Sequence, residues 1–453
     1  MKQTEIGLIP DDWEVKRLGD SVDILRGGSP RPIENYLTTN ADGINWIKIG
    51  DVKPNDKYIR KTEEKIIPEG KSRSREVKKG DFILSNSMSF GRPYILAIDG
   101  CIHDGWLTIQ KYAETFDKEF LYYLLGSDEV FNQYVQMAAG SSVQNLNKDK
   151  VADLQLKIPP LPEQQRIAKA LSDVDALIST TEKLIQKKKN IKQGAMQNLL
   201  TGKKRLPGFG NKQTDLFVPN GTHTKEVKDV SPEQIRLSAK MKQTELGEIP
   251  EDWEVKNINK ECTIKARIGW QGLKSTEYLD SGDYILITGT DFDSGFINWK
   301  SCSYVTKWRF DQDKNIQIKQ GDVLITKDGT IGKVAFLNEI PMQGTLNSGV
   351  FVIRPKNPDK MDSVFLSLIF NSFWFDSFLE QITSGSTIVH LYQKDFVKFN
   401  FPLPSKEEQT AIANVLSSMD KEIETLNTKL EKYRNLKTAM MQQLLTGKIR
   451  LVK

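Results

Sequence analysis

The feature that most constrains the fold of this chain is an internal duplication. Residues 1–17 read MKQTEIGLIPDDWEVKR and residues 241–257 read MKQTELGEIPEDWEVKN, which are identical at 13 of 17 positions. A second match joins residues 140–206 to 385–451, and the run Leu-Leu-Thr-Gly-Lys at 199–203 recurs at 444–448. A repeat of this length predicts two copies of one structural unit rather than one continuous core.

The middles of the two copies have diverged much further than their ends. Only scattered matches survive there, such as Lys-Gly-Asp at 79–81 with Gln-Gly-Asp at 320–322, and Ile-His-Asp-Gly at 102–105 with Leu-Asn-Ser-Gly at 346–349. Constant ends around variable middles are expected of two modules that share a fold and recognise different targets. Neutral drift after the duplication is the alternative explanation.

Short β-prone runs bounded by glycine turns, such as 46–49, 82–84 and 323–326, predict that each middle is a mixed, β-rich domain. A helix is expected over residues 118–136. After each middle, a proline-rich segment (159–162 and 402–404) precedes a long run of apolar residues at alternating spacings of four and three. This spacing predicts a long helix with one apolar seam in each copy, ended by Gly202 and Gly447.

The seam of the first helix is predicted to contain Ile167, Leu171, Val174, Ile178 and Ile185, and that of the second Ile412, Leu416, Met419, Ile423, Leu426 and Leu430. Each helix would have about 38 residues and a length of about 57 Å. We expect the two helices to pair in antiparallel fashion, because the second module must follow the end of the first helix and precede the start of the second. An ordinary helical hairpin core is the alternative reading of the seam alone.

The predicted fold class is therefore α+β, with two mixed β-rich target recognition domains joined by two long helices that form an antiparallel coiled coil with pseudo-twofold symmetry. The expected boundaries are 1–158 for the first recognition domain, 159–206 for the central helical spacer and 207–240 for a polar linker. The second recognition domain is expected at 241–401, and the C-terminal helical spacer at 402–453.

This arrangement resembles the specificity (S) subunits of Type I restriction-modification enzymes. The resemblance rests on Ile-Pro-Asp-Asp-Trp-Glu-Val at 9–15, Gly-Ser at 140–141, Pro-Leu-Pro-Glu-Gln-Gln-x-Ile-Ala at 160–168 and Leu-Leu-Thr-Gly-Lys at 199–203. It covers nearly the whole chain in the family's order of recognition domain, helix, recognition domain and helix. The second helix start departs from the pattern, with Ser-Lys-Glu-Glu at 405–408.

The resemblance implies a DNA-binding, non-catalytic subunit that reads an asymmetric bipartite site in double-stranded DNA. It also implies docking of two methyltransferase (M) subunits and motor-nuclease (R) subunits, with S-adenosylmethionine, ATP and Mg²⁺ on those partners and no cofactor on this chain. The residues agree, because neither an amino-methyltransferase motif around Pro159-Pro160 nor a phosphate-binding loop is present. The carboxylates at 11–14 lie too close together in sequence for a nuclease motif.

Composition excludes several other classes of protein. Three cysteines and three histidines are scattered without metal-ligand spacing, so neither a disulfide framework nor a metal site is expected. No signal peptide or membrane-spanning run is visible, which predicts a cytoplasmic protein without a membrane partner. The net charge of +5 is compatible with a polyanionic partner.

Candidate DNA contacts are the polar and basic residues of the diverged loops, because sequence is read by side chains on base edges. In the first module these are Arg26, Arg31, Lys48, Arg73, Arg75, Asn86, Ser87 and Arg92. In the second module they are Arg267, Trp270, Gln271, Lys274, Lys327, Asp328, Lys333 and Asn347. For each of them a solvated surface residue is the alternative. The stretch 183–214 contains no acidic residue and includes lysines at 187–189, which either face solvent or lie over spacer DNA or an acidic partner.

Two rival functions remain open from the sequence. One is the recognition subunit of a related system in which a single partner polypeptide carries methyltransferase and nuclease. The other is an interaction scaffold without a DNA role.

Overall fold

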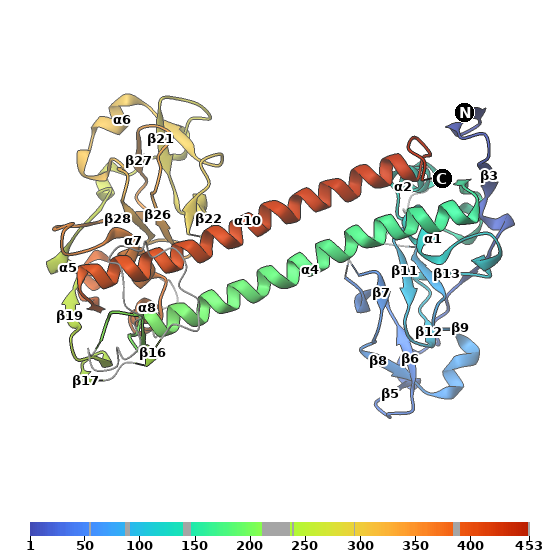
Figure 1. The fold of residues 1–453 in the computed structure, drawn as a ribbon, viewed down its shortest axis with the longest axis horizontal. Coiled ribbons are helices and arrows are strands. Elements are labelled where there is room, and N and C mark those ends of the chain that lie inside the picture. Colours follow the sequence, from blue (N-terminus) through green and yellow to red (C-terminus); the bar gives the residue numbers. More distant parts are fainter. Residues whose placement is uncertain are drawn as a thin grey trace, which may run out of the picture. The chain divides into compact units, whose positions relative to one another are not determined.

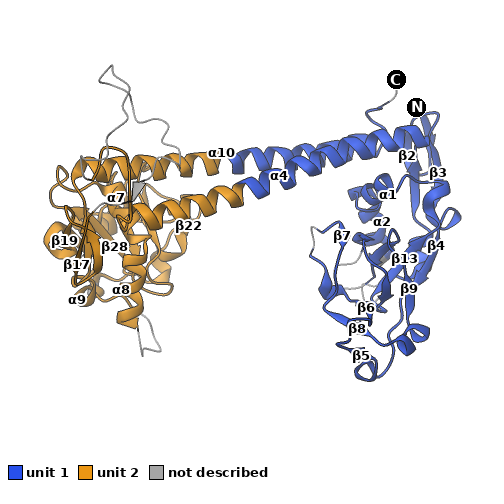
Figure 2. Ribbon diagram, turned by 60° about the horizontal axis from the view of Figure 1, so that its bottom comes forward, with its two compact units in different colours: residues 1–184, 426–453 blue, residues 185–425 orange. Residues whose placement is uncertain are grey.

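The computed structural model describes residues 1–53, 56–86, 91–138, 146–210, 236–237, 240–293, 295–383 and 390–451, with the side chains of residues 138, 236, 237 and 270 excepted. The chain divides into two compact units, one formed by Met1–Leu184 with Leu426–Lys453 and the other by Ile185–Thr425 (Figure 2). The boundary between the units falls within both long helices, so each unit contains one β-rich module and a segment of each helix. Most of the predicted linker, and Ser87 among the predicted contacts, lie outside the described residues.

Unit 1 contains two five-stranded sheets (Figure 1). The first has the order β4-β13-β10-β11-β7, formed by Asp23–Arg26, Trp106–Gln110, Phe82–Ser85, Pro93–Leu96 and Tyr58–Ile59. The second has the order β5-β8-β6-β12-β9, formed by Leu37–Thr38, Glu64–Ile66, Ile44–Ile47, Gly100–Ile102 and Arg75–Val77. Two further antiparallel pairs belong to the unit: the hairpin of β1 (Lys2–Thr4) with β2 (Gly7–Ile9), and the pair of β3 (Glu14–Arg17) with β14 (Gln155–Ile158), which lie far apart in the sequence.

Unit 2 repeats this plan with fewer strands. One sheet has the order β20-β28-β25-β26, formed by Cys262–Ala266, Val350–Pro355, Val323–Thr326 and Val334–Phe336. The other has the order β24-β21-β27, formed by Ser303–Val305, Tyr284–Ile287 and Gly344–Leu346. The remaining pairs are β15–β16 (Lys204–Arg205, Arg236–Leu237), β17–β18 (Met241–Thr244, Gly247–Pro250), β19–β29 (Glu254–Asn257, Asn400–Leu403) and β22–β23 (Phe292–Asp293, Phe296–Ile297).

Short helices complete each unit. Unit 1 has α1 (Lys118–Leu125), α2 (Asp128–Ala138) and α3 (Lys148–Ala152), and unit 2 has α5 (Ile258–Glu261), α6 (Lys307–Asp311), α7 (Ser363–Phe370), α8 (Phe373–Thr383) and α9 (Gln393–Phe396). The prediction of one helix over 118–136 was wrong in one respect. Gly126 ends α1, and the Ser127 hydroxyl accepts from the Val130 amide at 3.3 Å, so a second helix starts there.

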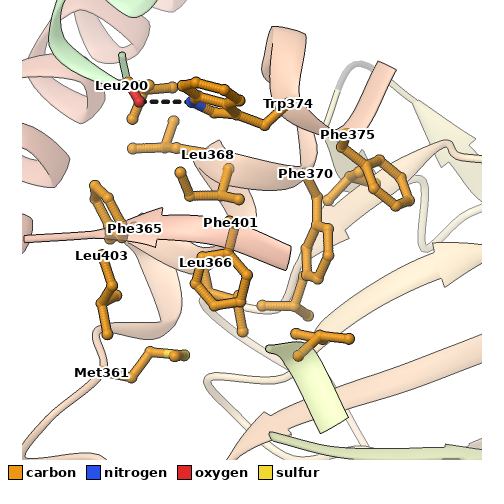
Figure 3. Packing of buried hydrophobic residues seen from close by; sticks show 14 of the residues in the cluster. Leu200, Met361, Phe365, Leu366, Leu368, Phe370, Trp374, Phe375, Phe401 and Leu403 are labelled. Carbon is orange, nitrogen blue, oxygen red and sulfur yellow. Dashed lines mark hydrogen bonds between the residues drawn. The ribbon is translucent and has the colours of Figure 1, made fainter. Parts of the chain in front are cut away.

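A group of aromatic side chains lies in the core of unit 2, which spans the module and the helix segments beside it. Phe365, Phe370 and Phe375 are at most 1% exposed. The Trp374 indole donates to the Leu200 carbonyl at 2.8 Å (Figure 3). This hydrogen bond joins α8 to the residue that follows the long helix α4 (Leu161–Leu199). The helix segments are therefore integral to the core and not attached at its surface.

The two long helices are α4 (Leu161–Leu199) and α10 (Lys406–Leu444), each of 39 residues. Ion pairs join the two helices within each unit, and residues later in α4 pair with residues earlier in α10. These pairs are Asp175–Lys437 (2.7 Å) and Glu182–Arg434 (2.8 Å) in unit 1, and Lys188–Glu422 (2.6 Å) and Lys192–Asp420 (2.5 Å) in unit 2. The antiparallel pairing is thus confirmed.

The helix seam contains the predicted apolar residues and also the buried Thr181. Ile178, Met419 and Leu426 are half-buried, and the other predicted seam residues are buried. Both helices end just before the predicted glycines, where Gly202 and Gly447 have φ of +66° and +71°. A Cβ at Gly202 would lie 2.3 Å from Pro250 Cγ, and one at Gly447 would lie 2.6 Å from Pro10 Cδ. Positive φ and this close approach both require glycine. Among the described helices none is long and apolar enough to span a membrane.

Candidate nucleic-acid interface

A short turn between β12 and β13, residues 103–105, lies at the centre of the predicted contacts in unit 1. The His103 amide donates to the Ile47 carbonyl at 3.0 Å, which extends the parallel pairing of β12 with β6. The Asn86 amide donates to the Gly105 carbonyl at 3.0 Å, which fixes the other end of the turn. Across the turn, His103 Nδ1 accepts from the Gly105 amide at 2.9 Å. We call residues 103–105 and their counterparts 347–349 the tip turns. Each of them joins a strand of one sheet to a strand of the other sheet in its unit.

The tip turn of unit 2 is held by the same three hydrogen bonds. The Asn347 amide donates to the Ile287 carbonyl at 3.0 Å, and the Lys327 amide donates to the Gly349 carbonyl at 2.8 Å. Asn347 Oδ1 accepts from the Gly349 amide at 2.7 Å. Main-chain geometry is therefore shared between the modules, whereas the side chains at equivalent places differ: histidine against asparagine, and asparagine against lysine.

The loops beside the tip turns repeat the pattern. The Gly91 amide donates to the Ser85 carbonyl at 2.8 Å, and the Gly332 amide donates to the Thr326 carbonyl at 2.9 Å. Both glycines have positive φ, +81° and +78°. The next residues are Arg92 in unit 1 and Lys333 in unit 2, both predicted contacts and both exposed. Each module thus holds a cation at the same place by the same backbone turn.

Arginines gather around the tip turn of unit 1. Arg26 Nε donates to the Asp104 carbonyl at 3.4 Å, and Arg75 Nε donates to the Arg26 carbonyl at 3.4 Å. Arg31, whose side chain is 80% exposed, reaches Asp104 Oδ2 at 3.3 Å. Arg73 is exposed next to the same loops, with its guanidinium over the Tyr36 ring. The structure therefore brings four of the five predicted arginines of unit 1 together.

The Asp104 carboxylate contacts one of these arginines, Arg31, and the neighbouring His103. It accepts from the Ser29 hydroxyl at 2.9 Å as well as from Arg31. Burial raises the pKa of Asp104, but the hydrogen bond from Ser29 and the nearby positive charges outweigh it, so the pKa lies below its ordinary value. The carboxylate is consequently charged and fixed at neutral pH.

Two other predicted contacts in unit 1 are already engaged within the protein. Asn86 is 4% exposed and its amide Nδ2 donates to the Asp104 carbonyl at 3.0 Å. Lys48 is half-buried and pairs with Glu64 at 2.7 Å. In this conformation Asn86 supports the tip turn and does not present a side chain to solvent.

In unit 2 the residues around the tip turn form a smaller charged group. Asp328 contacts His390 Nδ1 at 2.7 Å and lies 3.7 Å from Lys327 Nζ. Lys274 is exposed in a neighbouring loop. Trp270 belongs to the short 3-10 turn Gly269–Gln271, and its side chain lies outside the described part of the chain.

Arg267 and Gln271 are buried, although both were expected to be exposed. Arg267 is 2% exposed and donates to the Leu346 carbonyl at 2.8 Å, to Thr345 Oγ1 at 3.1 Å and to Gln312 Oε1 at 3.2 Å. Gln271 is 7% exposed. Because its donors are committed to the protein, Arg267 braces the strand that leads into the tip turn and does not present its guanidinium to solvent.

A buried cluster at each helix end was missed in the sequence. In unit 1, Glu163 is 1% exposed and accepts from Trp13 Nε1 at 3.0 Å and from Arg450 Nε at 2.8 Å. Arg450 also donates to Asp12 at 2.7 Å. Burial raises the pKa of Glu163, but hydrogen bonds from Arg450 and Trp13 hold it below its ordinary value.

Unit 2 contains the same cluster. Glu408 accepts from Trp253 Nε1 at 3.0 Å and from Arg205 Nε at 2.5 Å, and Arg205 donates to Asp252 at 2.9 Å. Three repeated features of the sequence could have revealed this cluster. They are the Asp-Trp at the start of each module, the glutamate at the start of each long helix and the arginine after each helix end.

Comparison with known proteins agrees with this architecture. The family model described as the Type I restriction modification DNA specificity domain matches residues 10–192 and 250–432. The Type I restriction enzyme MjaVIII specificity subunit of Methanocaldococcus jannaschii is 26% identical over 98% of this chain and 94% of its own. The putative MjaX specificity subunit of the same organism is 28% identical over 99% of this chain and 96% of its own.

Solved structures share the fold. The Type I restriction-modification S subunit from M. genitalium has a TM-score of 0.55 at 13% identity and covers 98% of each chain. A chain from the structural work on complex assembly and conformational transition of the type I R-M system has a TM-score of 0.56 at 18% identity. That match covers 98% of this chain and all of the other.

Proposed function

This chain belongs to the family of Type I restriction-modification specificity subunits, and on that premise we propose that it reads an asymmetric, two-part site in double-stranded DNA. The observation that carries the proposal is the pair of tip turns. Each is held by three equivalent hydrogen bonds, but the turns carry His103 in one module and Asn347 in the other. Two turns with the same main-chain geometry and different side chains favour two modules that recognise different half-sites.

The cationic loops supply the second support. Arg26, Arg31, Arg73 and Arg75 lie exposed around one tip turn, as expected for residues that contact phosphates and guanine edges. We propose these arginines, with Arg92 and Lys333, as the principal DNA contacts.

The paired helices are proposed to set the length of the unread spacer and to dock two methyltransferase subunits. Their 39-residue length and apolar seam support a stiff spacer. We propose no catalytic role for this chain. Methyl transfer with S-adenosylmethionine, and ATP- and Mg²⁺-dependent cleavage, would be performed by the methyltransferase and motor-nuclease partners.

The test uses the full chain co-expressed with its methyltransferase partner, with methylated adenines mapped on random-sequence DNA. A bipartite motif of two unlike half-sites is expected. Exchanging residues 20–140 for the module of another specificity subunit should alter one half only. Methylation without sequence preference, or a change in both halves, would refute modular reading.

The spacer role has a separate test. Duplicating 178–184 in α4 and 423–429 in α10 adds one heptad to each helix and keeps the seam in phase. Seven residues add about 10 Å, which corresponds to about three base pairs. The preferred spacer should lengthen accordingly, and a matched chain with one helix lengthened should lose activity. An unchanged spacer in the double insertion would show that the helices do not measure it.

A further inference from the structure

We propose that Asp104 and Asp328 are specificity-determining residues, each accepting a hydrogen bond from the exocyclic amino group of a base, cytosine N4 or adenine N6. The inference rests on the proposed function, since it names one base contact of each module. Both carboxylates lie at the tip turns, but they come from different positions of the repeat.

The carboxylate of each module reaches the tip turn by a different route. Asp104 is the middle residue of the first tip turn, whereas Ser348 stands at that position in the second. In unit 2 the carboxylate comes from the neighbouring loop, and a Cβ at Gly349 would lie 3.6 Å from both Cβ and Oδ2 of Asp328. The duplication therefore does not account for the shared carboxylate, because the residues that supply it are not repeat equivalents.

A histidine holds one oxygen of each carboxylate. His103 Nε2 lies 3.0 Å from Asp104 Oδ1, and His390 Nδ1 lies 2.7 Å from Asp328 Oδ1. His103 Nδ1 accepts from the Gly105 amide, so a neutral His103 carries its proton on Nε2 and donates it to Asp104. The two histidines also occupy different positions of the repeat. Each carboxylate is thus fixed in orientation through Oδ1.

The second oxygen, Oδ2, keeps hydrogen-bonding capacity in both modules, since an ionised carboxylate can accept about four hydrogen bonds. Within the described part of the chain, Asp104 Oδ2 is contacted by Arg31 alone, at 3.3 Å, and the Arg31 side chain is 80% exposed. Lys327 Nζ lies 3.7 Å from Asp328 Oδ2, which is beyond hydrogen-bonding distance. The side chains of Asp104 and Asp328 are 29% and 38% exposed, so a ligand can reach both carboxylates.

A fixed acceptor of this kind discriminates between base edges in the major groove. Cytosine N4 and adenine N6 are donors there, whereas guanine O6 and N7 and thymine O4 are acceptors that would face the carboxylate without a proton between them. Phosphates also repel a carboxylate, so an anion at a DNA-binding surface opposes binding unless a base donor offsets the repulsion. The expected partner is therefore a cytosine or adenine at one position of each half-site.

The test replaces each carboxylate by its amide, Asp104→Asn and Asp328→Asn, in the full chain with its methyltransferase partner. The histidine donor keeps the amide oxygen at the place of Oδ1, so the NH₂ group of asparagine takes the place of Oδ2. Unfolding temperatures close to that of the wild type are expected, because the contacts at Oδ1 remain. In D104N the preference for one base of the first half-site should fall about tenfold, with the second half-site as in the wild type. D328N should show the converse.

Removing the amino group from the DNA tests the same contact without changing the protein. Purine in place of the adenine, or 2-pyrimidinone in place of the cytosine, should weaken binding of the wild type about tenfold at that one position. The same DNA should cost D104N nothing further, because the acceptor is already absent.

Glu76→Gln is the matched control for charge. The Glu76 carboxylate pairs with Lys71 at 2.9 Å and lies on β9 next to Arg75. Loss of a negative charge alone predicts tighter binding to every sequence in both E76Q and D104N. A uniform change of this kind without a change at one position, or an unchanged motif in both D104N and D328N, would overturn the inference, while a two-part wild-type motif would keep the proposed function intact. A wild-type complex without sequence preference would overturn both.

Discussion

Replacing Arg205 by glutamine removes the positive charge from the buried cluster at the end of α4. The side chains of Arg205 and Glu408 are 4% and 2% exposed, and Nε–Oε1 and Nη2–Oε2 contacts of 2.5 and 2.6 Å join them. Without the guanidinium, the Glu408 carboxylate keeps the Trp253 indole as its side-chain donor. Breaking a buried pair by removing one partner costs about 3–5 kcal/mol.

A loss of about 4 kcal/mol corresponds to roughly a thousandfold increase in the local opening constant. Hydrogen exchange measured by mass spectrometry suits this change, because a chain of two units need not unfold in a single step. Peptides covering 199–206 and 406–416 should exchange roughly a thousandfold faster in Arg205→Gln, with unit 1 peptides unchanged. The double variant Arg205→Gln/Glu408→Gln should recover part of the protection, because no uncompensated charge remains.

The equivalent change in unit 1 provides the matched control. Arg450 is 25% exposed, so water can replace part of its interaction with Glu163, and Arg450→Gln should cost only about 2 kcal/mol. Lys169→Gln, which removes an exposed pair with Asp173, should cost at most about 0.5 kcal/mol. If Arg205→Gln changed exchange no more than Lys169→Gln, the reasoning from burial would be refuted.

Three further outcomes are expected. Gly202→Ala should lower the unfolding temperature of unit 2, because residue 202 has positive φ and an added Cβ would collide with Pro250. Gly194→Ala within α4 is the control: its Cβ would have no atom within 4 Å, and it should stabilise the chain by about 0.5–1 kcal/mol. Equal effects of the two substitutions would contradict this account of the helix end. The folded pKa of Glu163 is depressed, so the stability it contributes is present above the unfolded value of 4.5 and is lost as pH falls through the lower folded value. The unfolding temperature should therefore fall in acid. The fall should be smaller in Arg450→Gln, which lacks the group that lowers the pKa of Glu163. Lys187→Glu should weaken DNA binding and lower its salt slope if the outer helix face lies over the spacer, and an unchanged slope in filter binding would reject that contact.

The sequence predicted the elements whose signal is periodic or repeated. The duplication, the two long helices, their glycine ends and their antiparallel pairing all follow from spacing and chain order. The break between α1 and α2 was overlooked although Gly126-Ser127 marks it, because the apolar residues continue on both sides.

The candidate site was less predictable for a physical reason. Arg267 stands in a diverged loop, where a charged residue is ordinarily exposed, and only the fold shows that Gln312 and the 345–346 strand enclose it. The helix-end cluster joins Trp13 to Glu163 and Glu163 to Arg450, residues 150 and 287 positions apart. No local pattern reports a contact at such separation. The repetition of all three residue types in both copies was the one hint.

The shared frame of the tip turns has a consequence for how such proteins change. A turn that is anchored by amide and carbonyl groups on both flanks imposes little on the residue it carries, apart from an acceptor at the right height above glycine. A single codon change from histidine to asparagine then alters what is offered to a ligand without requiring a second, compensating mutation. Epistasis at this position should be weak, so that new target preferences become accessible by one-step substitutions in either copy independently.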